Sequence, residues 1–277
     1  MHETPDPSDF VAAIAPAVRR AATIARDLEG RVPNRPKAGE SSAVKAALTI
    51  ADTASQEALL ESLLESFPGV CLRAEEDTPT VSHFPEHAAA SVVIDPIDGT
   101  LRCYLEGRGA YAVMVGLAVD NEYQAALVAL PREGHLFHAA RGAGANAAMG
   151  DAPAQPAGLS GGGNQVLVSY ELPPAAADVL RKRGFEVVVA SGGAISVAPL
   201  IPGVRAGVRV ATNEPPNVSI RGRIGAMISA EAGAVLCSES GAPFPKSLEA
   251  PARVLLVAAD QNDLEPLLEA VAVAGIV

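Results

Sequence analysis

Two carboxylates leave the end of a predicted strand together in the segment 92–100, VVIDPIDGT. Its β-branched run favours a buried strand, and Pro96 predicts that the strand ends at Asp95, because proline cannot donate to a strand ladder. Asp98 follows, and Gly99 permits a tight turn. Hard divalent cations prefer carboxylate oxygens, and N–H groups freed at a turn can bind phosphate. The segment therefore predicts a site for a metal and a phosphate, with an ordinary surface turn as the simpler alternative for D-x-x-D-G alone.

A second acidic group lies upstream, where Glu75 and Glu76 follow a short predicted strand over 70–73. A segment ending in DPIDGT, 20 residues after an acidic pair, resembles the pattern of the inositol monophosphatase family of metal-dependent sugar phosphatases. Thr49-Ile50-Ala51-Asp52 is similar to the T-x-x-D of that family. Taken alone, Asp52 is more simply explained as a helix N-cap. The two roles can coexist, because a capping carboxylate can also face a site.

The resemblance implies a Mg²⁺ site and gives a role to each matching residue. The implied metal ligands are Glu75, Asp95, Asp98 and the Ile97 carbonyl. The residues implied to orient and deprotonate the attacking water are Asp52, Glu76 and Thr100. The residues implied to contact phosphate or substrate are Gly99, Thr100, Arg102, Glu214 and Arg221. Within this last group, the Gly99 and Thr100 N–H groups would hold phosphate oxygens, and Glu214 stands where the family contacts a substrate hydroxyl.

Arg221 is where the sequence departs from the family. The family supplies a further metal carboxylate from a Trp-Asp pair ahead of an E-A-G, and counting back from Glu231 places that pair on Ile220-Arg221. A guanidinium about 5 Å from a divalent cation repels it by roughly 6–7 kcal/mol at an effective dielectric constant of 20. We therefore expect fewer ions than the usual family site holds. Either Arg221 clamps a phosphate or another acid as a forked donor, or it points to solvent and the site is broken.

The elements that position these residues predict an α/β protein. The resemblance implies a layered αβαβα sandwich of the inositol monophosphatase and fructose-1,6-bisphosphatase type. Residues 1–157 are expected to form an N-terminal α+β half with an antiparallel sheet and the metal motifs, and 158–277 a C-terminal α/β half that completes the substrate site. Helical periodicity predicts helices over 9–28 (with Ser8 as N-cap), 54–66, 174–183, 194–200, 219–232 and 263–274. Extended segments are expected over 46–51, 111–119, 122–130, 135–139, 166–169, 185–190, 205–211 and 254–258, and a loop over 142–156.

Composition narrows the possible partners. The chain has 277 residues, 49% of them hydrophobic, and a net charge of -11. Such a charge argues against nucleic acid and anionic membranes as partners, and no apolar run approaches the roughly 20 residues of a membrane span. Three scattered cysteines and no signal segment predict a cytoplasmic protein. The expected partner is a small phosphorylated metabolite, and the family resemblance implies a homodimer.

Three functions are compatible with these residues. The first is a Mg²⁺-dependent phosphomonoesterase that hydrolyses a small sugar, cyclitol or nucleotide phosphate. The second is a diverged family member with an impaired metal site, which binds a phosphorylated or acidic ligand without hydrolysing it. The third is a related enzyme with altered chemistry, such as a lyase or isomerase. Arg221 distinguishes them, because its charge decides how many cations the site can hold.

Overall fold

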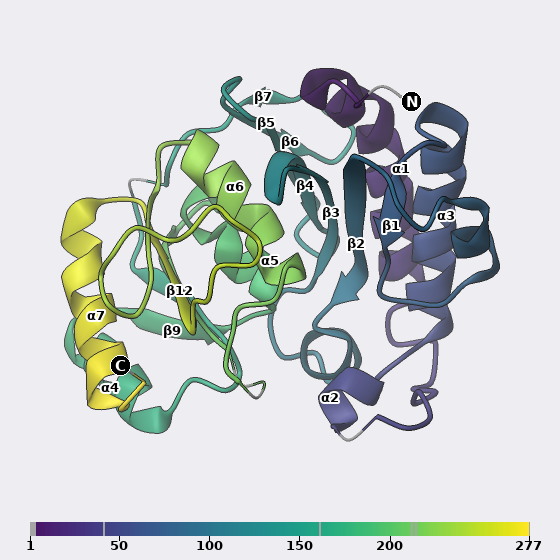
Figure 1. Cartoon of the computed structure of the whole chain (residues 1–277). Coiled ribbons are helices and arrows are strands. Elements are labelled where there is room, and N and C mark those ends of the chain that lie inside the picture. The colour runs from purple at the N-terminus through teal and green to yellow at the C-terminus, as the bar shows by residue number, and fades with distance from the viewer. Residues whose placement is uncertain (1–3, 41, 161, 212, 214, 277) are drawn as a thin grey trace.

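Five layers of helix and sheet stack in the order αβαβα (Figure 1), in a computed structural model that describes residues 4–40, 42–160, 162–211, 213 and 215–276. Helices α1 and α3 pack on the outer face of the first sheet, α5 and α6 lie between the two sheets, and α4 and α7 cover the second sheet. The predicted layered α/β sandwich is therefore confirmed. The helices are α1 (Pro7–Leu28), α2 (Ala43–Ala46), α3 (Ile50–Ser66), α4 (Pro174–Lys182), α5 (Gly192–Ser196), α6 (Ile224–Glu231) and α7 (Leu264–Val273).

The first sheet has seven strands in sequential order. They are β1 (Cys71–Arg73), β2 (Ala90–Asp98), β3 (Ala112–Val119), β4 (Glu122–Leu130), β5 (His135–Ala140), β6 (Ala145–Met149) and β7 (Gln155–Pro156). The pair β1–β2 is parallel and the others are antiparallel. Apolar side chains from α1 and α3, among them Phe10, Ile14 and Leu60, are buried against this sheet. This packing fixes the end of β2, where the predicted acids lie.

The second sheet has the strand order β11-β12-β10-β8-β9. Its strands are β8 (Gln165–Val168), β9 (Glu186–Val189), β10 (Val204–Val210), β11 (Val235–Cys237) and β12 (Val254–Ala258). Strands β8, β9 and β10 are parallel, so their carboxyl ends meet at one edge. The chain passes from one sheet to the other between Pro156 and Gln165, and the predicted domain division at 157/158 falls in this connection.

Several predicted element boundaries were wrong. The N-cap of α1 is Asp6 rather than Ser8, because the Asp6 side chain accepts the N–H groups of Ser8 and Asp9. The predicted extended segment 46–51 instead holds the end of α2 and the start of α3. The loop predicted over 142–156 contains β6, and the sequence analysis missed β11 as well. The helices predicted over 194–200 and 219–232 each begin or end in a 3₁₀ turn, η3 (Ala198–Leu200) and η4 (Arg221–Arg223).

Strand β2 does not end at Asp95 as Pro96 predicted. It continues to Asp98, but its pairing with β3 shifts register between Asp95 and Asp98. The missing proline N–H is accommodated by this irregularity rather than by termination of the strand.

None of the helices that the structure describes is both long and apolar enough to span a bilayer.

Candidate active site

Three acids gather where β1 and β2 end. The strands are parallel with Arg73 beside Val93, so the chain beyond β1 places Glu75 near Asp95. Asp95 is buried, and the charges of Glu75 and Asp98 act on it directly. Asp98 Oδ2 accepts the N–H of Gly193 at 2.5 Å, which ties the first sheet to α5. The predicted metal ligands are thus brought together.

The turn after β2 approaches α5 so closely that it requires glycine. Gly99 has a φ of +90°, and a Cβ at this position would lie 2.9 Å from Cβ of Ser191. The chain then enters a single wide π-helical turn, η2 (Thr100–Leu105). This backbone aims the Thr100 side chain back at α3.

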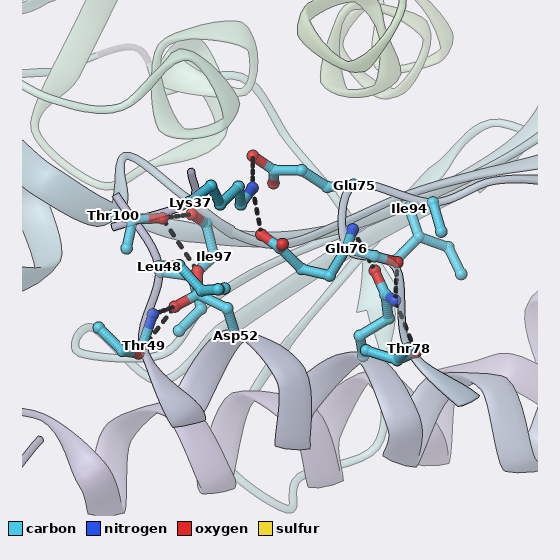
Figure 2. A network of polar contacts seen from close by, with 12 residues as sticks. Lys37, Leu48, Thr49, Asp52, Glu75, Glu76, Thr78, Ile94, Ile97 and Thr100 are labelled. Carbon is cyan, nitrogen blue, oxygen red and sulfur yellow. Dashed lines mark hydrogen bonds and ion pairs between the residues drawn. The ribbon is translucent and has the colours of Figure 1, made fainter. Parts of the chain in front are cut away.

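Asp52 and Thr100 form a buried pair (Figure 2). Thr100 Oγ1 lies 3.0 Å from Asp52 Oδ1 and 2.8 Å from the Ile97 carbonyl oxygen. The other carboxylate oxygen, Oδ2, accepts the N–H and the hydroxyl of Thr49, both at 2.7 Å. Thr49 is therefore the N-cap of α3, and Asp52 is the third helical residue of a capping box rather than the predicted N-cap. The helix start holds this carboxylate rigidly toward the site.

Glu76 is positioned by two residues that the sequence analysis missed. Lys37 Nζ lies 2.7 Å from Glu76 Oε1 and 3.8 Å from Glu75 Oε1. Gln56 of α3 holds the backbone of Glu76 from both sides, accepting its N–H at 3.0 Å and donating to its carbonyl at 2.6 Å. The one feature of the sequence that could have indicated Gln56 is that a polar residue stands at a position of α3 that faces the protein interior.

Gln56 bonds the backbone N–H and carbonyl of the buried Glu76 and also donates to the Thr78 hydroxyl at 3.0 Å, so we expect Gln56→Leu to cost about 1–3 kcal/mol of unfolding free energy for each buried group left unpaired. Chemical denaturation measures this loss. Gln165→Leu is the matched control, because the Gln165 amide bonds an exposed Glu186 side chain. Equal losses in the two variants would show that Gln56 is not a support of the Glu76 segment.

Arg221 points into the site and not to solvent. Its Nε donates to the Ile94 carbonyl at 3.1 Å and its Nη2 to the Ala74 carbonyl at 3.0 Å, so the guanidinium joins the ends of β1 and β2. Its charge acts on Glu75, Asp95 and Glu76. Arg221 thus supplies positive charge where the family pattern has a metal-binding aspartate.

Burial dominates the electrostatics of the acids. It raises the pKa of Asp52, opposed by the hydrogen bonds from Thr49 and Thr100. It likewise raises the pKa of Glu76, opposed by Lys37. Burial, followed by the charges of Glu75 and Asp98, raises the pKa of Asp95 well above its usual range. In this cluster the cost of burying the carboxylates outweighs the attraction of Lys37 and Arg221, so the pKa values stay raised.

Two oxygens of the cluster fit a bound cation. Glu75 Oε2 and Asp95 Oδ1 are both buried and accept no hydrogen bond from any other described residue, and the two carboxyl groups lie close enough to share a proton. In the part of the chain that the structure describes, no three His, Cys, Asp or Glu side chains already stand in an ion-binding arrangement. Oxygen donors with unfilled lone pairs suit Mg²⁺. Lys37 and Arg221 supply two of the positive charges that these acids need, which leaves room for few ions.

One predicted substrate residue, Arg102, makes its side-chain contacts outside this cluster. Arg102 pairs with Glu106 at 2.8 Å and stacks over the ring of Tyr170, with its Cζ 4.3 Å from the centroid. Its assignment to phosphate remains a prediction. Glu214 lies outside the described residues, and its role also remains a prediction.

An αβαβα sandwich with paired acids at the end of β2 has the architecture of the inositol monophosphatase and fructose-1,6-bisphosphatase type. A family model described as the inositol monophosphatase family matches residues 6–172, which is more than half of the chain. The chain belongs to the inositol monophosphatase family.

Solved structures share this fold over nearly the whole chain. Thermotoga maritima IMPase has a TM-score of 0.72 at 17% identity and covers 97% of this chain and 99% of its own. Mycobacterium tuberculosis SuhB has a TM-score of 0.66 at 21% identity and covers 96% and 97%. An IMPase/NADP phosphatase complexed with Mg²⁺ and phosphate has a TM-score of 0.70 at 14% identity, with 96% of each chain covered.

Curated relatives match over a shorter stretch. The histidinol-phosphatase of Chlorobaculum parvum is 35% identical over 101 residues, which are 35% of this chain and 36% of the relative. A putative Nus factor SuhB of Neisseria meningitidis is 35% identical over 94 residues, 34% of each chain. The matches span about a third of the length of these relatives.

Proposed function

We propose that the protein is a Mg²⁺-dependent phosphomonoesterase acting on a small sugar, cyclitol or nucleotide phosphate. One observation carries this proposal: two buried carboxylate oxygens, on Glu75 and Asp95, accept no hydrogen bond from any other described residue and lie in the same site as the Asp52–Thr100 pair. Family membership supports it, as do the similarity to the histidinol-phosphatase of Chlorobaculum parvum and the Mg²⁺ and phosphate bound by a structural neighbour. The family resemblance also leads us to propose a homodimer.

The cation-binding residues follow from the cluster. The proposed Mg²⁺ ligands are Glu75, Asp95, Asp98 and the Ile97 carbonyl. We propose that the site holds fewer Mg²⁺ ions than the family pattern implies, because Arg221 occupies part of it. When bound, Mg²⁺ would neutralise phosphate charge and lower the pKa of a bound water. The Gly99 and Thr100 N–H groups at the turn are the proposed hydrogen-bond donors to the phosphate oxygens.

The attacking water would be activated by the pair on α3 and η2. A water beside Thr100 Oγ1 would donate its proton to that oxygen while the Thr100 hydroxyl proton moves to Asp52 Oδ1, 3.0 Å away. Burial raises the pKa of Asp52, which improves it as a proton acceptor. Glu76, held by Lys37, offers a second acceptor that orients the water. Arg221 would stabilise negative charge that develops on the phosphoryl oxygens.

We expect release of inorganic phosphate from a panel of sugar, cyclitol and nucleotide monophosphates in millimolar Mg²⁺, and its loss when EDTA removes the metal. Calorimetric titration with Mg²⁺, with and without phosphate, counts the ions in the same preparation. Phosphate binding without turnover would favour the alternative of a ligand-binding protein. Absence of both metal binding and phosphate release would reject the proposal.

A further inference from the structure

Arg209 is a charged residue on the inner face of the second sheet. Its neighbour on β10, Val208, packs with the cluster under α4 and α7. Gly207 faces the opposite way, because a Cβ there would lie 2.5 Å from the Ile195 carbonyl oxygen of α5. Side chains alternate along a strand, so Arg209 shares the face of Gly207 and points into the helix layer between the sheets. Figure 1 shows α5 in this layer.

Two glycines make room for the guanidinium. A Cβ at Gly192 would lie 1.6 Å from Arg209 Nη1, and a Cβ at Gly222 would lie 2.6 Å from Arg209 Cζ. Neither glycine has a positive φ, so backbone conformation does not require glycine at these positions. Their lack of side chains instead permits the guanidinium to lie between the starts of α5 and η4.

This guanidinium lacks a partner within the described residues. Its Nη1 atom is buried without a hydrogen bond, and none of the ion pairs formed by the described part of the chain includes Arg209. Arg205 on the same strand, in contrast, has an acidic partner, because its Nη2 lies 2.6 Å from Asp263 Oδ1. The Arg209 side chain as a whole is half-buried, but a buried nitrogen without a hydrogen bond is costly, and a ligand anion would supply the missing acceptor.

The position of Arg209 places it beside the candidate active site. Gly192 precedes Gly193, whose N–H binds Asp98 Oδ2, and Gly222 follows Arg221. Arg209 also lies near the carboxyl end of β10, at the edge where parallel strands of layered α/β proteins bind ligands. A ligand held at the acid cluster could therefore extend toward this side chain.

We propose that Arg209 binds a second anionic group of the substrate, a carboxylate or a second phosphate, and so selects phosphomonoesters that carry one. This inference rests on the proposed function only for the identity of the first group, the phosphate at the acid cluster. A forked guanidinium matches both anions, which it binds through paired N–H donors.

Three phosphate esters with the same six-carbon chain test the proposal. Glucose 6-phosphate lacks a second anion, 6-phosphogluconate adds a carboxylate, and glucose 1,6-bisphosphate adds a phosphate. Their dissociation constants are measured by calorimetry with the full chain, and phosphate release is followed in parallel. We expect at least one two-anion probe to bind about tenfold or more tightly than glucose 6-phosphate, and Arg209→Gln to remove most of that preference. The two-anion probe that binds more tightly than glucose 6-phosphate shows whether Arg209 prefers a carboxylate or a phosphate.

The control variants distinguish the loss of a specific anion-binding side chain from a general loss of charge or of folded protein. Arg205→Gln removes the same charge from the same strand and should keep the preference, and Arg209→Lys should keep part of it because a single ammonium replaces the fork. Thermal unfolding verifies that each variant is folded. An unchanged preference in Arg209→Gln, an equal loss in Arg205→Gln, or no preference in the unmodified protein would overturn the inference. Arg209-dependent binding without phosphate release would uphold it while rejecting the proposed phosphatase.

Discussion

Asp95→Asn is expected to abolish phosphate release and, at neutral pH, to make the metal-free protein more stable. Asp95 is buried beside Glu75 and Asp98, and one of its oxygens accepts no hydrogen bond from any described residue other than Glu75. Without a cation, its negative charge is stabilised mainly by Arg221. An amide of the same shape removes that charge, so the repulsion disappears together with a proposed metal ligand.

The sign of the pH dependence follows from the raised pKa values of Glu75 and Asp95. A carboxyl whose pKa is higher in the folded state binds its proton more tightly there than in the unfolded chain. Its stabilising contribution is complete below the unfolded pKa of about 4 and is lost as the pH rises through the higher folded value. Thermal unfolding of the metal-free protein should therefore show a Tm that falls over this window, and Asp95→Asn should flatten the fall.

Thermal scans between pH 4 and 8 in EDTA and in Mg²⁺, together with a phosphate-release assay, measure both effects. Mg²⁺ should raise the Tm of the unmodified protein much more than that of Asp95→Asn, because the ion stabilises the state it binds. Asp178→Asn removes an exposed carboxylate that pairs with Arg181 and serves as the control. A lower Tm for Asp95→Asn in EDTA at neutral pH would contradict the electrostatic argument.

The proximity of the acids could be predicted from the sequence because the information is local. DPIDGT carries a strand, a turn and two acids in consecutive residues, and the parallel pairing of β1 with β2 brings Glu75 to them. Lys37 and Gln56 could not be found in this way. Lys37 reaches Glu76 because its loop pairs with the segment before α3, through the bond from the Lys37 N–H to the Ala46 carbonyl. The sequence of a Pro- and Gly-rich loop contains no periodic pattern from which this long-range pairing could be predicted.

Two further misses have physical causes. Strand β6, ANAAM, is rich in alanine, which has weak strand propensity, and it forms because β5 offers an edge beside it. The strand at β10 was predicted, but alternation does not say which face meets the helix layer, so Arg209 could not be distinguished from a solvated arginine. Arg221 was singled out because its position departs from the family motif, but only the structure shows that it bonds the Ile94 and Ala74 carbonyls instead of pointing to solvent.

Arg221→Asp is expected to increase the number of Mg²⁺ ions bound and to make folding strongly dependent on them. The guanidinium lies among Glu75, Glu76 and Asp95 and donates to two carbonyls at the ends of β1 and β2. Its removal leaves buried carboxylates uncompensated, which costs on the order of 3–5 kcal/mol. An aspartate adds a further negative charge, so the metal-free variant should be less stable than Arg221→Ala.

In Mg²⁺ the order of stability should reverse, so that Arg221→Asp is more stable than Arg221→Ala. Loss of the guanidinium removes a repulsion of roughly 6–7 kcal/mol on a divalent cation 5 Å away at an effective dielectric constant of 20, and the new carboxylate offers another ligand. Calorimetric stoichiometry should then be higher for Arg221→Asp than for the unmodified protein, with Arg221→Ala as the control that removes the charge without adding a ligand. If Arg221→Asp binds no more Mg²⁺ than Arg221→Ala and gains no more Tm from the ion, the arginine does not stand in place of a metal. Its function would then be limited to joining the two strand ends, and the ion count would be set by the acids alone.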